Sequence, residues 1–166
     1  MKIAFSGLQG SGKTYLANQY RFNNGGFITK LATPVYIIAE KIQEITNQPK
    51  EKNRRLLQLI GTEIGRSIID KDIWIKLLLE EIERVENICS PDICNVYVDD
   101  VRFKNEVQGL RKNGFKIVRV IRTKKYTKRR FVFHKSEIQL LGWELVDRIR
   151  KRLGMKLKYF DEIIYN

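Results

Sequence analysis

The stretch KIAFSGLQGSGKT, residues 2–14, opens the chain and decides which fold to expect. Its first half, KIAFSG (2–7), is short and apolar, which is typical of a buried strand. Its second half satisfies the spacing G-x-x-x-x-G-K-T with Gly7, Gly12, Lys13 and Thr14. The residues KTYLANQYRF (13–22) then follow a helical pattern. A glycine-rich loop therefore lies between a predicted strand and a predicted helix, the context in which this spacing is meaningful.

The glycine loop, residues 7–14, predicts binding of a nucleoside triphosphate. Glycines let backbone N–H groups turn inward around a polyphosphate, and the following helix presents its positive end to the same phosphates. Lys13 can reach the β- and γ-phosphate oxygens, and the Thr14 hydroxyl can bind Mg²⁺. The expected triphosphate contacts are Gly7, Gly10, Ser11, Gly12, Lys13, Thr14 and Tyr15. A dinucleotide-binding loop would need G-x-G-x-x-G, and the glycine spacing here does not supply it.

The rest of the chain alternates between strand and helix patterns. Further strands are predicted at 26–31, 95–103, 115–122 and 159–166. Helices are predicted at 33–45, 53–68, 72–88, 105–114 and 144–154. This alternation predicts a three-layer α/β fold, with a five-stranded, mostly parallel sheet covered by helices on both faces. Ligands bind beyond the carboxyl ends of the strands in such sheets, so the chemistry is expected there.

Two predicted helices carry local signals. In the helix at 33–45, Thr33 is expected as the N-cap and Pro34 as the first helical residue. The helix at 53–68 contains Gly61 and Gly65. Each glycine costs a helix interior about 1 kcal/mol relative to alanine, so their presence there needs a reason.

Composition narrows the class of protein without choosing a function. The 166 residues suit a single domain, 1–166. The net charge of +13 favours an anionic partner, which could be nucleic acid, a membrane surface or small phosphates. No apolar run reaches the length of a membrane helix, and MKIAFSG is too short for a signal peptide, so we expect a cytoplasmic protein. Cys89 and Cys94, with the only histidine far away in sequence, are expected to be free thiols.

Carboxylates and arginines stand near the predicted strand ends. Asp99 and Asp100 end an apolar strand, where a P-loop protein needs a carboxylate for Mg²⁺. Successive strand residues face opposite ways, so the sequence leaves open which of the two serves the metal. The guanidinium group grips phosphate through two parallel hydrogen bonds. Candidate phosphate clamps are Arg66, Arg102, Arg122, Arg129 and Arg130.

Four short patterns follow the glycine loop in order. The first, A-x-P, is Ala32-Thr33-Pro34. The second, Q-x-x-G-T-E-x-x-R, is formed by Gln58, Gly61, Thr62, Glu63 and Arg66. The third, D-V-R-F-x-N-E, is formed by Asp100, Val101, Arg102, Phe103, Asn105 and Glu106. The fourth, H-x-S-E, is formed by His134, Ser136 and Glu137. With the loop, these patterns span most of the chain. Together they resemble the motifs of the phage-type deoxynucleoside monophosphate kinases, which belong to the P-loop nucleoside monophosphate kinase superfamily.

The resemblance implies transfer of the γ-phosphoryl group of ATP to a deoxynucleoside monophosphate, with ATP and Mg²⁺ required. It implies an adenylate-kinase-like fold with an acceptor region at 32–70 and a mobile, basic lid at 123–136. The helix at 53–68 would be broken at its glycines to line the acceptor pocket. The implied catalytic residues are Lys13, Arg66, Arg102, Arg122, Arg129 and Arg130. The implied substrate contacts are Lys30, Gln58, Glu63, Arg66, Asp100, Arg102, Trp74, His134 and Glu137.

Some residues have competing interpretations. Trp74 lies on an apolar helix face and is favoured as a core residue over a base-stacking one, whereas Trp143 is equally suited to stacking and packing. His134 is interpreted as a hydrogen-bonding lid residue rather than an acid–base catalyst.

Two other functions fit parts of the sequence. A P-loop kinase with a small hydroxyl acceptor would need a general base, for which Asp99 or Asp100 is available. The basic and aromatic stretch RTKKYTKRRFVFHK (122–135) suits a nucleic-acid-binding module. We favour the lid, with no specific nucleic acid and no membrane as partner. The oligomeric state is left open, a homodimer included, as are the accepted base and sugar.

Overall fold

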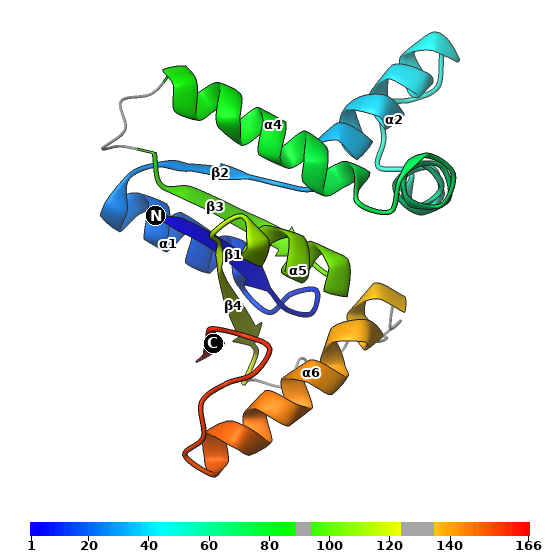
Figure 1. The fold of residues 1–166 in the computed structure, drawn as a ribbon. Helices are drawn as coiled ribbons and strands as arrows, with labels where there is room; N and C mark the ends of the chain where they lie inside the picture. The colour runs from blue at the N-terminus through cyan, green and yellow to red at the C-terminus, as the bar shows by residue number, and fades with distance from the viewer. Residues whose placement is uncertain (89–93, 124–134) are drawn as a thin grey trace.

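The computed structural model describes residues 1–88, 94–123 and 135–166, and it omits the side chains of residues 135–139 (Figure 1). The elements in chain order are β1 (Lys2–Ser6), α1 (Lys13–Asn24), β2 (Phe27–Thr29), α2 (Thr33–Ile45), α3 (Arg54–Gln58), the π-helix η1 (Leu59–Ile69), α4 (Ile73–Ile88), β3 (Val96–Val101), α5 (Lys104–Lys112), β4 (Lys116–Ile121), α6 (Lys135–Arg152) and β5 (Glu162–Tyr165). The predicted alternation of strands and helices is confirmed.

The five described strands form one sheet in the order β2-β3-β1-β4-β5, and every pair is parallel. The predicted sheet is therefore confirmed, and it is wholly parallel within the described residues. β1 is the central strand, and the chain crosses from one side of it to the other between β3 and β4. The carboxyl end of β1, where the glycine loop begins, is thus the switch point at which such sheets bind ligands.

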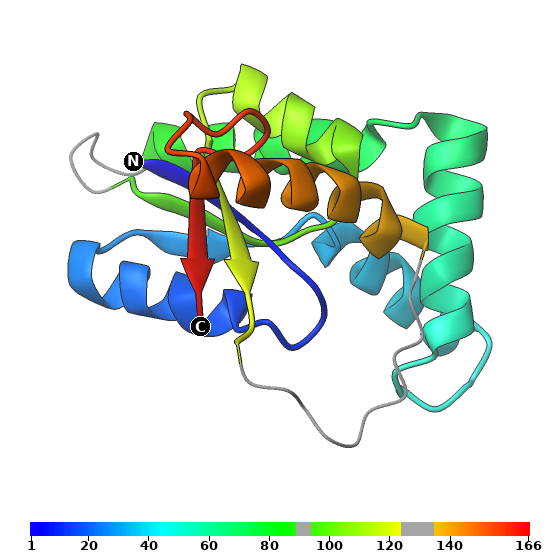
Figure 2. The ribbon, with the colours of Figure 1, turned by 90° about the horizontal axis from the view of Figure 1, so that it is seen from below.

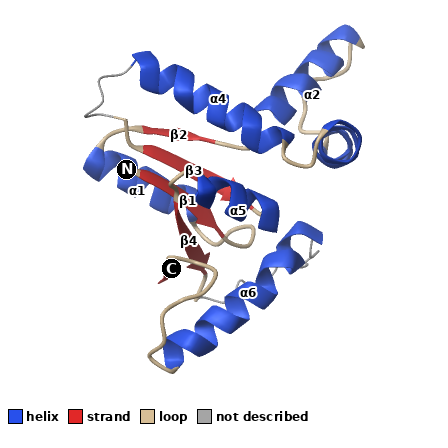
Figure 3. Ribbon diagram, viewed as in Figure 1, coloured by secondary structure: helices blue, strands red, loops and turns tan. Residues whose placement is uncertain are grey.

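The sheet is the middle of three layers (Figures 2 and 3). α1 covers one face, and α4, α5 and α6 cover the other (Figure 2). The core on the α1 side contains Ile3, Phe5, Leu16, Ala17, Tyr97, Val118 and Val120. The core on the opposite side includes Ala4, Trp74, Leu78, Val98, Leu110, Ile117 and Leu140. No helix in the described part of the chain is long and apolar enough to cross a membrane.

The starts of two helices differ from the prediction. Ala32, not Thr33, is the N-cap of α2, and the backbone N–H groups of Leu31 and Ala32 donate to the carboxylate of Asp100 on β3. α6 begins at Lys135 rather than at residue 144, with Gly142 inside it. A glycine in a helix interior weakens the sequence signal, which explains the late predicted start.

The predicted break in the helix at 53–68 is wrong. α3 runs on into η1, whose hydrogen bonds follow the wider i→i+5 pattern. Both glycine positions instead contact Trp74 of α4, and Gly65 makes room for its ring. A Cβ on Gly65 would lie 2.2 Å from the Trp74 ring, and the backbone oxygen of Gly61 accepts the Trp74 indole N–H at 2.8 Å. Gly65 thus allows η1 and α4 to pack closely.

Gly65→Ala is expected to destabilise the protein by about 1–3 kcal/mol, because the added methyl group overlaps a buried ring. Gly142→Ala is the matched control in α6. A Cβ there meets nothing within 4 Å, and alanine favours a helix over glycine by up to about 1 kcal/mol. Urea unfolding midpoints measure both changes. Equal effects of the two substitutions would contradict the packing role of Gly65.

Candidate functional site

The glycine loop joins β1 to α1 and depends on backbone conformations that suit glycine. Gly10 and Gly12 have φ angles of 79° and 96°. Gly12 is also the N-cap of α1, where no side chain caps the helix. A Cβ on Gly12 would lie 1.9 Å from the side-chain nitrogen of Asn166, and one on Gly7 would lie 2.5 Å from the backbone oxygen of Val120. The uncapped helix end leaves backbone N–H groups for an anion.

Lys13 places its ammonium group within the loop. Its Nζ donates to the backbone oxygens of Gly7 and Leu8, both at 2.8 Å, and the residue is 8% exposed. Ser11 Oγ is buried without a hydrogen-bond partner among the described residues. A buried cation and a hydroxyl therefore lie together in the loop, as phosphate binding requires.

Asp99, at the end of β3, faces the glycine loop. Its Oδ2 accepts the Thr14 hydroxyl at 2.6 Å and lies 3.7 Å from Lys30 Nζ. Its Oδ1 is buried and has no hydrogen-bond partner in the described part of the structure. The described residues hold no group of three or more His, Cys, Asp or Glu side chains that could cage a metal. One carboxylate and one hydroxyl fit Mg²⁺, which usually keeps several waters and binds substrate phosphates.

Asp100 faces the segment that leads into α2 instead. Its two oxygens accept the backbone N–H groups of Leu31 and Ala32, both at 2.9 Å. Burial raises the pKa of the Asp100 carboxyl from 3.8 to about 6. The two N–H groups lower this pKa, and the charges of Glu106 and Asp99 raise it further. The two consecutive carboxylates therefore have different surroundings, which the sequence did not resolve.

Asp100 is expected to make the stability of the unliganded protein decrease with rising pH. Its raised pKa favours folding most below the unfolded pKa near 4, and this contribution is lost as pH rises through about 6. The change is on the order of 3 kcal/mol. In Asp100→Asn this component should be absent from unfolding free energies measured between pH 4 and 7. An identical pH slope in the two proteins would contradict the assigned pKa.

The arginines predicted at strand ends lie in different environments. Arg66 pairs with Glu106, with 2.7 Å between Nη2 and Oε1. Arg102 is exposed and directly follows β3. Arg122 Nη1 donates to the backbone oxygen of Gly10 at 2.8 Å, so it borders the glycine loop. Arg129 lies outside the described residues, as do Arg130, His134 and nearly all of the predicted lid.

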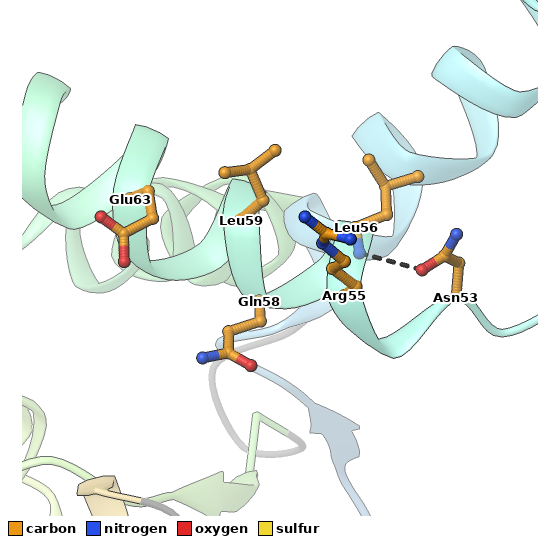
Figure 4. Close-up of a pocket in the computed structure, with 6 residues that line it drawn as sticks. All are labelled: Asn53, Arg55, Leu56, Gln58, Leu59 and Glu63. Atoms are coloured by element: carbon orange, nitrogen blue, oxygen red, sulfur yellow. Dashed lines mark hydrogen bonds between the residues drawn. The ribbon is translucent and has the colours of Figure 1, made fainter.

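Two predicted acceptor residues line a pocket on α3 and η1. Gln58 and Glu63 are both exposed, and the pocket measures about 540 Å³. Gln58 and Leu59 extend to opposite sides of the helix (Figure 4). The lining residues are Asn53, Arg55, Leu56, Gln58, Leu59 and Glu63. The structure thus brings two of the acceptor residues to one hollow.

Four other predicted residues have separate positions. Trp74 is 3% exposed and belongs to the core, the favoured interpretation. Trp143 stacks on Tyr159, with ring centroids 4.7 Å apart, so packing is the role that the structure shows. Tyr15 is exposed on α1. Glu137 lies in the first turn of α6, where side chains are not described.

Sequence reasoning missed a buried ion pair behind the glycine loop. Arg119 of β4 is 2% exposed, and its Nε donates to Glu144 of α6 at 2.8 Å. Its Nη1 donates to the hydroxyl of Ser6, the last residue of β1, at 3.0 Å. The sequence signal for this pair was Arg119 itself, because it lies inside an apolar strand that should be buried on both faces. The pair connects α6 to the strand that carries the loop.

The parallel sheet, the glycine loop after its central strand and the Thr14–Asp99 contact define a P-loop nucleotide-binding protein of the kinase type. A family model for deoxynucleotide monophosphate kinase matches residues 2–158, so the chain belongs to that family. The resemblance noted from the motifs is confirmed.

A curated relative is the deoxynucleoside-5′-monophosphate kinase of Escherichia phage T5. It is 33% identical over 88 residues, which cover 53% of this chain and 33% of the relative. The alignment therefore spans about a third of the relative's length.

Proposed function

We propose that this protein transfers the γ-phosphoryl group of ATP to the phosphate of a deoxynucleoside 5′-monophosphate, giving ADP and the deoxynucleoside diphosphate. The observation that carries the proposal is the convergence of Lys13, Thr14 and Asp99 at the carboxyl edge of the sheet, in a chain of the deoxynucleotide monophosphate kinase family. The acceptor region lies beside them, because Asp100 binds the start of α2.

The donor half is built from the glycine loop. Backbone N–H groups at the start of α1 and the Lys13 ammonium bind the ATP phosphates and offset their negative charge. Thr14 Oγ1 and the Asp99 carboxylate would hold Mg²⁺, which when bound would supply further charge neutralisation on the phosphates. Arg122, next to Gly10, is a candidate clamp on the transferring group. Arg129, Arg130, His134 and Glu137 belong to the proposed lid side of the site.

The acceptor half is built from α2, η1 and the end of β3. Asp100 fixes the entry to α2, and the exposed Arg102 binds the acceptor phosphate. Gln58 and Glu63 contribute polar groups in the pocket of about 540 Å³, a size suited to a small ligand. Lys30, 3.7 Å from Asp99, adds positive charge between the two halves.

A phosphate acceptor fits the two aspartates better than a hydroxyl acceptor does. A hydroxyl needs a base to take its proton, whereas the phosphate of a nucleotide is already anionic. Asp100 uses both oxygens on backbone N–H groups, and Asp99 accepts the Thr14 hydroxyl. Asp100 thus has no oxygen left to act as a base, and Asp99 is proposed to serve the metal. A nucleotide phosphate, which needs no base, is therefore the better acceptor.

The proposed partners are ATP and a deoxynucleoside monophosphate, with no specific nucleic acid and no membrane. We further propose that residues 1–166 act as one domain, in the cytoplasm where free nucleotides are present. For a viral chain this is the host cytoplasm. Of the basic stretch at 122–135, only the first two residues precede the undescribed segment, so the fold offers no observation that favours nucleic-acid binding.

A coupled assay of ADP release, run with every deoxynucleoside and ribonucleoside monophosphate, tests the proposed function. The expected result is Mg²⁺-dependent turnover with a marked preference among the deoxynucleoside monophosphates. If the rate of ADP release is the same with every monophosphate, or the same without any monophosphate, the proposal is contradicted and a hydroxyl acceptor is favoured.

A further inference from the structure

Glu106 is a buried carboxylate that joins η1 to the end of β3. It lies in the first turn of α5 and is 2% exposed. Its Oε1 lies 2.7 Å from Arg66 Nη2 on η1. Its Oε2 accepts the backbone N–H groups of Arg102 and Phe103, at 2.7 and 2.9 Å. One side chain therefore holds both the acceptor region and the backbone of Arg102.

Arg66 is surrounded by protein groups. Besides its pairing with Glu106, its Nη1 donates to the backbone oxygen of Gly61, and its guanidinium carbon lies 4.2 Å from the centre of the Phe103 ring. The side chain is 19% exposed. The carboxylate at 2.7 Å compensates the charge of the Arg66 guanidinium, and the Phe103 ring covers one of its faces. Arg66 therefore attracts an incoming phosphate only weakly.

Arg102 is in the opposite situation. It is exposed, and in the described ranges its side chain forms no hydrogen bond or ion pair; its backbone N–H, by contrast, is bound by Glu106. The position of its Cα is therefore fixed, whereas its guanidinium is available. The anchored backbone fixes the starting point of the side chain. Its planar guanidinium, which has no partner among the described residues, can therefore form two parallel hydrogen bonds to a phosphate.

We propose that Arg66 is a positioning residue for the acceptor phosphate and that Arg102 is the residue that contacts it. Arg66 compensates the charge of Glu106 and so keeps that carboxylate on the N–H groups of Arg102 and Phe103. Without Arg66, an uncompensated carboxylate would be buried, and it would move toward water or take up a proton. This inference rests on the proposed function, because it concerns how the acceptor nucleotide is held.

Two variants distinguish positioning from direct contact. Arg66→Met leaves the Glu106 charge buried without its cation. Arg66→Met/Glu106→Gln removes both charges, and the glutamine amide oxygen can still accept the N–H groups of Arg102 and Phe103. In steady-state kinetics, the single variant should raise the KM for the monophosphate about tenfold or more, with the KM for ATP unchanged. The double variant should return the monophosphate KM to within about threefold of that of the unsubstituted chain.

A guanidinium that binds the phosphate directly would not be replaced by a neutral pair. A double variant as impaired as Arg66→Met would therefore overturn the inference. Arg102→Met, with and without Glu106→Gln, is the control. It should raise the monophosphate KM about tenfold or more, and Glu106→Gln should not rescue it. An unaffected Arg102→Met would also overturn the inference.

Failure of the proposed function has a different signature. It would appear as no transfer from ATP to any monophosphate by the unsubstituted chain. Urea unfolding of each variant checks the fold. If Arg66→Met does not fold, the folded double variant still decides: a near-normal monophosphate KM supports positioning, and one like that of Arg102→Met overturns it.

Discussion

Replacing Lys13 by alanine is expected to lower the rate of phosphoryl transfer by about 10³-fold or more. The Lys13 ammonium is buried in the glycine loop, within 2.8 Å of two backbone oxygens. In the proposed reaction, negative charge develops on the phosphoryl group held by this loop, and water cannot replace a fixed cation at that point. The measurement is the initial rate of diphosphate formation at saturating ATP and monophosphate.

The Lys13→Ala result needs evidence that the fold is intact. The lost side chain frees two hydrogen-bonded carbonyls, each worth about 1 kcal/mol, so the variant should still unfold cooperatively in urea. Lys112→Ala, at the exposed end of α5, is the matched control and should keep full activity. A folded Lys13→Ala protein with activity within about tenfold of the unsubstituted chain would refute the role of the glycine loop.

Asp99→Asn is expected to raise the Mg²⁺ concentration for half-maximal activity about tenfold or more and to lower the maximal rate about 10²-fold. Asparagine keeps the shape of the side chain and can still accept the Thr14 hydroxyl, but it removes the negative charge. It also changes the buried Oδ1, which has no partner among the described residues. Initial rates titrated with Mg²⁺ at fixed total ATP measure both effects.

Asp100→Asn is the matched substitution one residue away. Its carboxylate holds the start of α2 rather than the glycine loop, so the Mg²⁺ midpoint should stay unchanged while the KM for the monophosphate rises. The reverse pattern, with the Mg²⁺ midpoint shifted by Asp100→Asn and not by Asp99→Asn, would show that the metal assignment is wrong.

The sequence predicts most of the fold because its local signals agree. Each predicted strand overlaps an observed one, and α2 matches its predicted range of 33–45. The failures occur where contacts between distant residues override local propensity. Gly61 and Gly65 indicated a broken helix, yet the helix continues, and Gly65 makes room for the ring of Trp74 on α4. The N-cap of α2 is Ala32 rather than Thr33, and the Ala32 N–H donates to Asp100, a residue far away in the sequence.

In the candidate site, too, local patterns predict some residues, whereas others depend on contacts between distant parts of the chain. The glycine loop carries its chemistry in consecutive residues, so Lys13 and Thr14 are found from spacing alone. The choice between Asp99 and Asp100 depends on which face of β3 meets the loop, and that requires the packed sheet. The partner of Arg66 lies forty positions along the chain, so no local pattern could reveal it.

In the proposed reaction, the γ-phosphoryl group of ATP is transferred to the phosphate of a second nucleotide. The most direct measurement is a ³¹P NMR spectrum of the products formed from ATP, Mg²⁺ and the preferred deoxynucleoside monophosphate. We expect the monophosphate signal to be replaced by the coupled α- and β-phosphate signals of a diphosphate, in step with ADP formation. Consumption of ATP with the monophosphate signal unchanged, or with a new phosphate ester on a hydroxyl, would contradict it.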